Sequence, residues 1–84
     1  MKVTVFGTKK YDFTDNRTGA KKVGITAHYT CLSNNSNVKG LEYGKFGCAI
    51  ENDYMYGLLN DLILPCELDL EFNRYGNVID FRIL

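Results

Sequence analysis

The sequence predicts an all-β domain, a five-stranded OB-type small barrel with a protruding β-hairpin and a short helix between strands three and four. One observation behind this is the period-two alternation of apolar and acidic residues over residues 66–72, typical of a half-buried strand. The other is the order of segments along the chain: three strands, a short helical segment and two more strands. An SH3-like small barrel is the alternative, because it also uses five short, bent strands.

The whole chain, residues 1–84, is expected to form this single OB-type domain, because its length leaves room for little more. No apolar run approaches the roughly 20 residues that cross a bilayer, so no membrane association is expected. The first ten residues lack the apolar segment of a signal peptide. These features predict a cytoplasmic protein.

The first two strands are predicted to form a long hairpin. Residues 2–7 make the first strand, and residues 11–14 continue it past a bend. Residues 15–19 contain Asp, Asn and Gly, which favour tight turns. The second strand covers residues 22–32, so the far end of this hairpin carries several basic side chains.

A polar loop is predicted at residues 33–40, followed by a third strand over residues 41–50. Either Asn52 or Asp53 can cap a short helix after that strand. Four apolar residues then follow the helical spacing i, i+3, i+4 and i+7: Met55, Leu58, Leu59 and Leu62. Pro65 would stop the helix.

The chain ends in a second predicted hairpin. Its strands cover residues 66–72 and 78–84, and residues 73–77 form the turn between them. Arg74 and Tyr75 lie in this turn, where an aromatic side chain has little core to fill. The turn is therefore a candidate ligand-binding position.

Charge is distributed unevenly, although the net charge is zero. Residues 1–50 hold eight Lys or Arg and three acids, whereas residues 51–84 hold two and seven. This asymmetry permits one basic face on a neutral molecule, and a mixed solvated surface is the simpler alternative.

Catalytic and metal-binding motifs are missing from the sequence, so we expect neither an enzyme nor a cofactor or metal site. The single histidine, His28, has no paired nucleophile and is expected to be a solvated or cross-strand residue. The three cysteines contain no C-x-x-C pair, and they are expected to be reduced thiols that pack as small apolar groups.

Single-stranded nucleic acid requires cations for its phosphates and aromatic faces for its unstacked bases. The candidate cations are Lys9, Lys10, Arg17, Lys21, Lys22 and Arg74. The candidate stacking residues are Tyr75 and one of Tyr43 and Phe46, because one of those two must point away from the core. Five other aromatic residues are expected to pack inside: Tyr11, Phe13, Tyr29, Phe72 and Phe81. Tyr54 and Tyr56 are expected on the surface of the helix, at a possible subunit contact.

Two segments resemble the filamentous-phage single-stranded DNA-binding proteins of the gene V type. One is FTDNRTGAKKVGITAHYTCL at residues 13–32, which is similar to the DNA-binding wing of that family. The other is LPCELDLEFNRYGNVIDFRIL at residues 64–84, which is similar to its closing hairpin. The resemblance implies that Arg17 and Lys21 contact phosphate and that Tyr75 stacks on a base.

The resemblance further implies an OB-type fold, a homodimer and sequence-tolerant coating of single-stranded DNA during replication of a phage or mobile element, in the host bacterial cytoplasm. RNA binding fits the same residues, because recognition of a 2′-hydroxyl has no signature here. The alternative function is a small β-barrel protein–protein interaction module without a nucleic-acid role. Such a module would use an exposed sheet edge or the region of Tyr54 and Tyr56.

Overall fold

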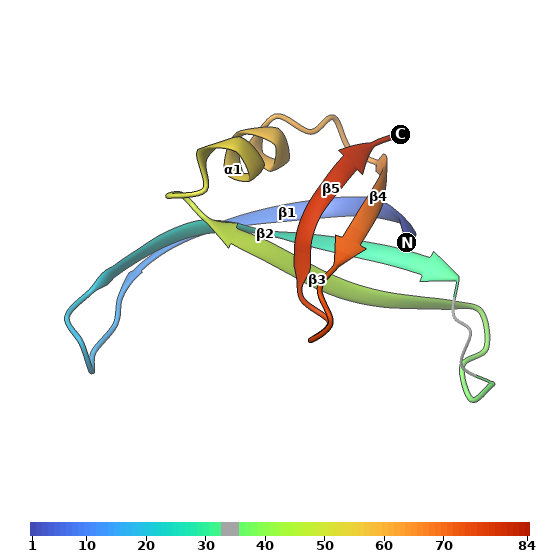
Figure 1. Ribbon diagram of the computed structural model, residues 1–84, viewed down its shortest axis with the longest axis horizontal. Helices are drawn as coiled ribbons and strands as arrows, with labels where there is room; N and C mark the ends of the chain where they lie inside the picture. The colour runs from blue at the N-terminus through green and yellow to red at the C-terminus, as the bar shows by residue number, and fades with distance from the viewer. Residues whose placement is uncertain (33–35) are drawn as a thin grey trace.

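The computed structural model describes residues 1–32 and 36–84, and Figure 1 shows five strands and one short helix. The elements are β1 (Lys2–Thr14), β2 (Lys21–Leu32), β3 (Leu41–Ala49), α1 (Asp53–Asn60), β4 (Cys66–Phe72) and β5 (Val78–Ile83). The structure is mostly β, and the predicted order of three strands, a short helix and two strands is confirmed. Part of the polar loop expected at residues 33–40 lies outside the described residues.

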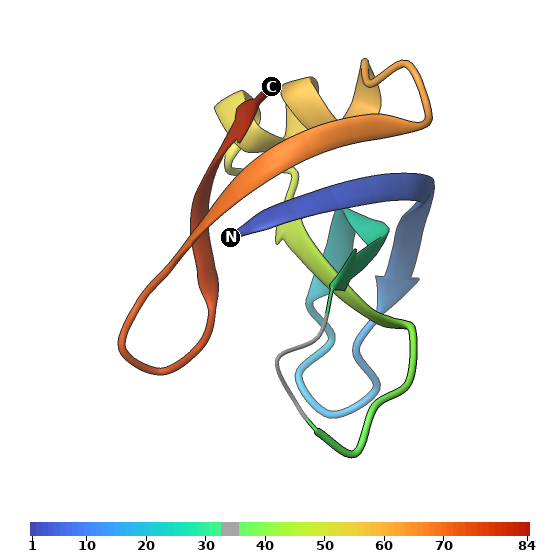
Figure 2. The ribbon, with the colours of Figure 1, turned by 90° about the vertical axis from the view of Figure 1, so that its right-hand side faces the viewer.

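All the strands belong to one antiparallel sheet with the order β3-β2-β1-β4-β5. Across the described ranges this sheet is open, with β3 and β5 as its edge strands. The sheet curls strongly, as the end-on view in Figure 2 shows, so its two halves face a common interior. In the described part of the chain, the strand pairings do not join β3 to β5.

The hairpin of β1 and β2 is the longest feature of the fold and projects to the lower left of Figure 1. Its strands pair from Thr4 opposite Thr30 to Thr14 opposite Lys21, with one irregularity between Val5 and Gly7. We call the part of the hairpin at residues 8–26 the wing.

The core fills the inner face of the curled sheet. It consists of Val3, Val5, Ile25, Ala27, Phe46, Met55, Leu59, Leu68, Leu70 and Phe81. The rings of Phe46 and Phe81 lie 5.9 Å apart, so a side-chain contact joins the edge strands β3 and β5. Burial of these apolar side chains is the main force that holds the two halves together.

Helix α1 forms after β3, as the sequence predicts, and it packs against the core. The side chain of Asn52 caps it by accepting a hydrogen bond from the Met55 amide at 3.4 Å. Met55 and Leu59 are buried, and Leu58 and Leu62 pack against the core at its margin. Within the described residues, no helix has the length and apolar character needed to span a membrane.

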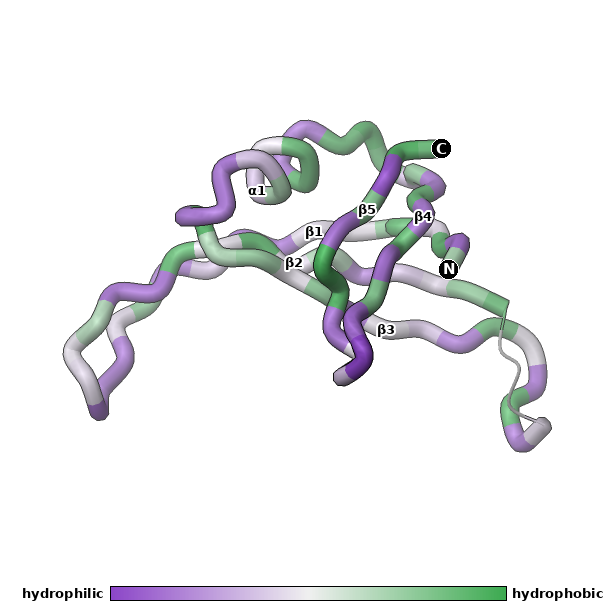
Figure 3. Tube along the Cα trace, in the orientation of Figure 1, coloured by the Kyte–Doolittle hydropathy of each residue, from purple (hydrophilic) through white to green (hydrophobic). Residues whose placement is uncertain are grey.

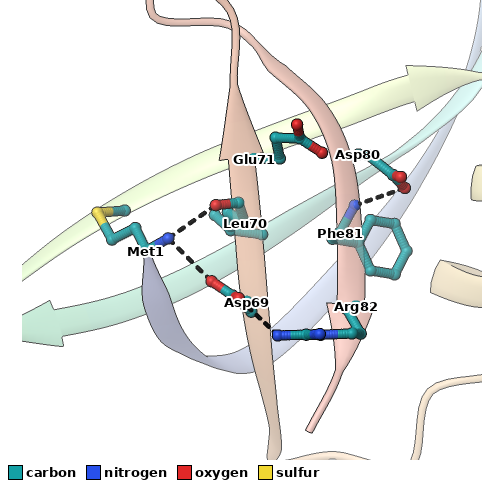
Figure 4. A pocket seen from close by; sticks show the side chains of 7 residues that line it. All are labelled: Met1, Asp69, Leu70, Glu71, Asp80, Phe81 and Arg82. Carbon is teal, nitrogen blue, oxygen red and sulfur yellow. Dashed lines mark hydrogen bonds and ion pairs between the residues drawn. The ribbon is translucent and has the colours of Figure 1, made fainter.

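Asp69 on β4 joins the chain terminus to β5, as Figure 4 shows. One carboxylate oxygen accepts a hydrogen bond from the Met1 amino group at 2.9 Å, and the other accepts from Arg82 at 3.1 Å. The hydrogen bond from the amino group, then its charge and that of Arg82, lower the pKa of the Asp69 carboxyl.

A lowered pKa in the folded state means that ionised Asp69 stabilises the fold above the unfolded-state pKa. This stabilisation disappears as the pH falls below the unfolded-state pKa and through the lower folded-state pKa. Because the group is exposed, we expect Asp69→Asn to lower the urea midpoint only modestly at pH 7. The variant should match the wild type at a pH below the folded-state pKa, where the wild-type carboxyl is protonated. An equal difference at both pH values would show that charge is not the cause.

Candidate nucleic-acid interface

The strands β1, β2 and β3 have a second face that points away from the core, which we call the outer face. On β2 it carries Thr26, His28 and Thr30, which alternate with the core residues Ile25 and Ala27. Their partners on β3 are Gly47, Lys45 and Tyr43, respectively. The register therefore places a histidine, a lysine and a tyrosine on neighbouring positions of one surface.

Tyr43 and Phe46 have opposite surroundings. Tyr43 is 82% exposed on the outer face, whereas Phe46 is 8% exposed and packs against Phe81 and Tyr29. The expectation that one of the two points away from the core is met by Tyr43. Phe46 is a core residue without a free ring face, so its assignment as a stacking candidate is corrected.

Phe6 extends the aromatic surface and was missed by the sequence reasoning. Its exposed ring lies 6.4 Å from the ring of His28, tilted by 39°. His28 is thus a cross-strand residue on the outer face, as expected. The sequence contains a signal for Phe6. Alternate residues of a strand point to opposite faces, so Phe6, which follows the inward-facing Val3 and Val5, is expected to point outward.

The turn between β4 and β5 presents Tyr75 to solvent with 71% of its surface exposed. The side chain of Asn73 fixes this turn by accepting hydrogen bonds from the amides of Tyr75 and Asn77, at 2.9 and 3.0 Å. Gly76 has a φ of 82°, a conformation that glycine adopts without a steric penalty. Figure 3 shows that the turn is mostly hydrophilic.

Arg74 lies over the ring of Tyr75, with its guanidinium carbon 4.9 Å from the ring centroid. It also donates a hydrogen bond of 2.7 Å to the phenol oxygen. The cation–π contact places a positive charge on one ring face. The second face remains available for stacking, because the side chain is mostly exposed.

A cleft of about 340 Å³ separates the β4–β5 turn from β3. Lys45 and Gly47 line it from β3, and Gly76 and Asn77 line it from the turn. The structure thus brings the turn that carries Arg74 and Tyr75 close to the strand that carries Tyr43 and Lys45. These segments are about 30 residues apart in the sequence.

The wing cations divide between two faces. Lys9 is the register partner of Thr26, which lies on the outer face. Lys22 lies four residues before Thr26 on β2 and therefore points to the same face. Lys10 and Lys21 hold the opposite positions, and Lys21 forms an exposed ion pair of 3.8 Å with Asp12. Arg17 is exposed in the turn at the wing end. Lys9 and Lys22 are therefore the wing cations placed on the same face as Tyr43.

The cations next to β4 are ion-paired with its acidic residues, unlike the cations of the outer face in the described part of the chain. Lys2 pairs with Glu67 at 3.5 Å, and Arg82 pairs with Asp69 at 3.1 Å. In residues 1–32 and 36–84, the outer-face cations Lys9, Lys22 and Lys45 make no such pair. Their charges are available for an anionic ligand.

Two groups beneath the outer face have raised pKa values. Burial raises the pKa of the Tyr29 phenol, and the charges of Cys31 and Glu42 add to the effect. Burial also raises the pKa of the Cys48 thiol. Both groups are therefore protonated at neutral pH and add no negative charge opposite a phosphate.

Two of the aromatic residues expected in the core differ from the prediction. Phe13 is 54% exposed, because the wing extends beyond the core, and Tyr11 lies on the outer face opposite Gly24. Phe81 is buried, and Tyr29 and Phe72 pack at the core margin. On α1, Tyr54 is exposed, whereas Tyr56 packs partly against the core.

Comparison of the chain with protein-family models, curated proteins and solved structures gives no match. The outer face carries exposed aromatic rings, among them Tyr43 and Phe6, and lysines that form no ion pair within the described residues. The turn between β4 and β5 adds the exposed ring of Tyr75.

Proposed function

We propose that the protein binds single-stranded DNA without strong sequence preference and coats it during replication of a phage or mobile element. The observation that carries this proposal is Tyr43, which is 82% exposed on the outer face, two residues from Lys45 on β3. Lys45 lines a cleft whose other side includes Gly76 and Asn77, in the turn that presents Tyr75. An exposed tyrosine contributes little to the core. A base stacked on it is worth about 1–3 kcal/mol.

The proposed barrel is of the OB type. In support, the strands follow the expected order and the edge strands meet through Phe46 and Phe81. OB-type barrels bind oligonucleotides on the face of strands two and three and on the loops after strands one and four. Tyr43, Lys45 and Arg74 occupy the corresponding places here, and RNA would use the same contacts.

The proposed assembly is a homodimer, as the resemblance to the gene V type implies. In support, Ile63, Ile83 and Leu84 are exposed apolar residues near the chain end, and Ile63 and Ile83 line one apolar hollow. A second copy could cover these side chains. Sedimentation equilibrium would measure the mass, and a monomer at all concentrations would exclude this part of the proposal.

Titration with oligothymidine tests the proposal, with tyrosine fluorescence as the readout, because the chain has six tyrosines and no tryptophan. We expect quenching that reverses with salt. If about four phosphates are neutralised, log K falls with log salt at a slope near −3, so affinity drops roughly 50-fold between 50 and 200 mM salt. A flat salt dependence would contradict the assignment of the cations.

The competing function is a protein-interaction module. In residues 1–32 and 36–84 the outer edges of β3 and β5 have no partner strand, which favours this function. Such a module would add an extended segment of its partner to one edge strand. The same titration separates the two functions, because the module would leave tyrosine fluorescence unchanged at every concentration of oligothymidine.

A further inference from the structure

The wing contains a cavity of about 610 Å³ that extends from the point where β3 leaves the sheet toward the turn at the wing end. Pairing between β2 and β3 ends at Gly24 opposite Ala49, and the Ile50 amide then donates to the Val23 carbonyl at 2.9 Å. Beyond this point β3 no longer covers the edge of β2. Tyr11, Phe13, Lys22 and Glu51 are among the residues that line the space.

Two aromatic rings form one wall of this cavity. The rings of Tyr11 and Phe13 lie 6.0 Å apart and are tilted by 44°. The phenol of Tyr11 occupies the space that a Cβ atom on Gly24 would need, so the glycine permits its position. Phe13 is more than half exposed. The core does not account for this aromatic pair, which instead offers a surface for a flat ligand.

The charged residues of the cavity limit which ligand fits. Lys22, the register partner of Phe13, makes no ion pair within the described ranges, and neither does Glu51. Asp15 also lines the space, but its carboxylate already accepts a hydrogen bond from the Arg17 amide at 2.8 Å. Lys21 lines the space as well, but it forms an ion pair of 3.8 Å with Asp12. Within the described ranges, the cavity therefore combines an aromatic wall, one lysine without an ion pair and one carboxylate that is free to accept hydrogen bonds.

A carboxylate accepts hydrogen bonds from the amino groups of cytosine and adenine, whereas thymine presents a carbonyl oxygen at the equivalent position. We propose that this cavity holds one unpaired nucleobase with an exocyclic amino group. Tyr11 and Phe13 contact its face, Glu51 accepts from its amino group, and Lys22 contacts the adjoining phosphate. This inference rests on the proposed single-stranded DNA binding, and adds a local base preference to it.

The test is fluorescence anisotropy with labelled oligodeoxycytidine and oligothymidine of equal length. We expect the wild type to bind oligodeoxycytidine about 5- to 10-fold more tightly, as one charge-assisted hydrogen bond allows. Glu51→Gln should reduce this preference to below about 2-fold. The matched control is Glu71→Gln, an exposed acid on β4 outside this cavity, which should keep the preference.

Phe13→Ala tests the aromatic wall, and it should weaken binding of both oligonucleotides about 5-fold or more. Circular dichroism would verify that the variant is folded. Two results would overturn this inference and leave the proposed function standing. One is equal affinity of the wild type for the two oligonucleotides, and the other is a preference for oligodeoxycytidine that persists in Glu51→Gln. Failure to bind either oligonucleotide would overturn both.

Discussion

Replacing Tyr43 and Tyr75 together with alanine is expected to weaken binding of labelled oligothymidine roughly 30-fold or more. Each base–aromatic stack is worth about 1–3 kcal/mol, and the two rings lie on separate elements, so their losses should add. Fluorescence anisotropy is the suitable measurement, because the substitutions remove two of the intrinsic fluorophores. The wild-type fold should persist, since both side chains are mostly exposed.

Tyr54→Ala is the matched control for this double variant. Tyr54 is 69% exposed on α1, and Figure 1 places that helix on the opposite side of the molecule from the β4–β5 turn. Its replacement should leave the affinity for oligothymidine unchanged. Equal losses in the control and the double variant would mean that the bound strand does not follow the outer face.

Leu68→Ala should have the largest effect on stability, a loss of about 2–5 kcal/mol in the free energy of unfolding. Leu68 is fully buried, and it lies on β4 between the pairings to β1 and β5. Small domains are stable by only about 5–15 kcal/mol, so much of the protein could unfold at 37 °C. Urea unfolding followed by circular dichroism would measure the loss.

Leu32→Ala provides the control for this substitution, with the same residue type at a position that is 83% exposed. Its effect should remain within about 0.5 kcal/mol. Similar shifts of the urea midpoint for the two variants would contradict the position of the core on the inner face of the sheet.

The sequence predicts the local elements well, because each has a short-range signal. The alternation over Cys66–Phe72 gives β4, and the spacing of Met55 and Leu59 gives α1. The polar turn around Tyr75 also indicates that this ring is exposed. Such features depend on neighbours in the chain, which the sequence displays directly.

Features that depend on pairing between distant strands were less accessible. The choice between Tyr43 and Phe46 needs the register of β3 against β2, where Phe46 faces the buried Ala27. The exposure of Phe13 depends on how far the wing extends past the core. Likewise, only the register of β1 against β2 shows that Lys9 lies on the outer face and Lys10 on the opposite face.

The two faces of the sheet have separate physical roles. Inner-face side chains such as Leu68 and Phe81 hold the halves together, while Tyr43 and Lys45 on the outer face contribute almost nothing to that packing. Mutations can therefore accumulate on the outer face without a cost in folding. Substitutions that change the chemistry of the outer face can therefore be made without repacking the core around Leu68 and Phe81.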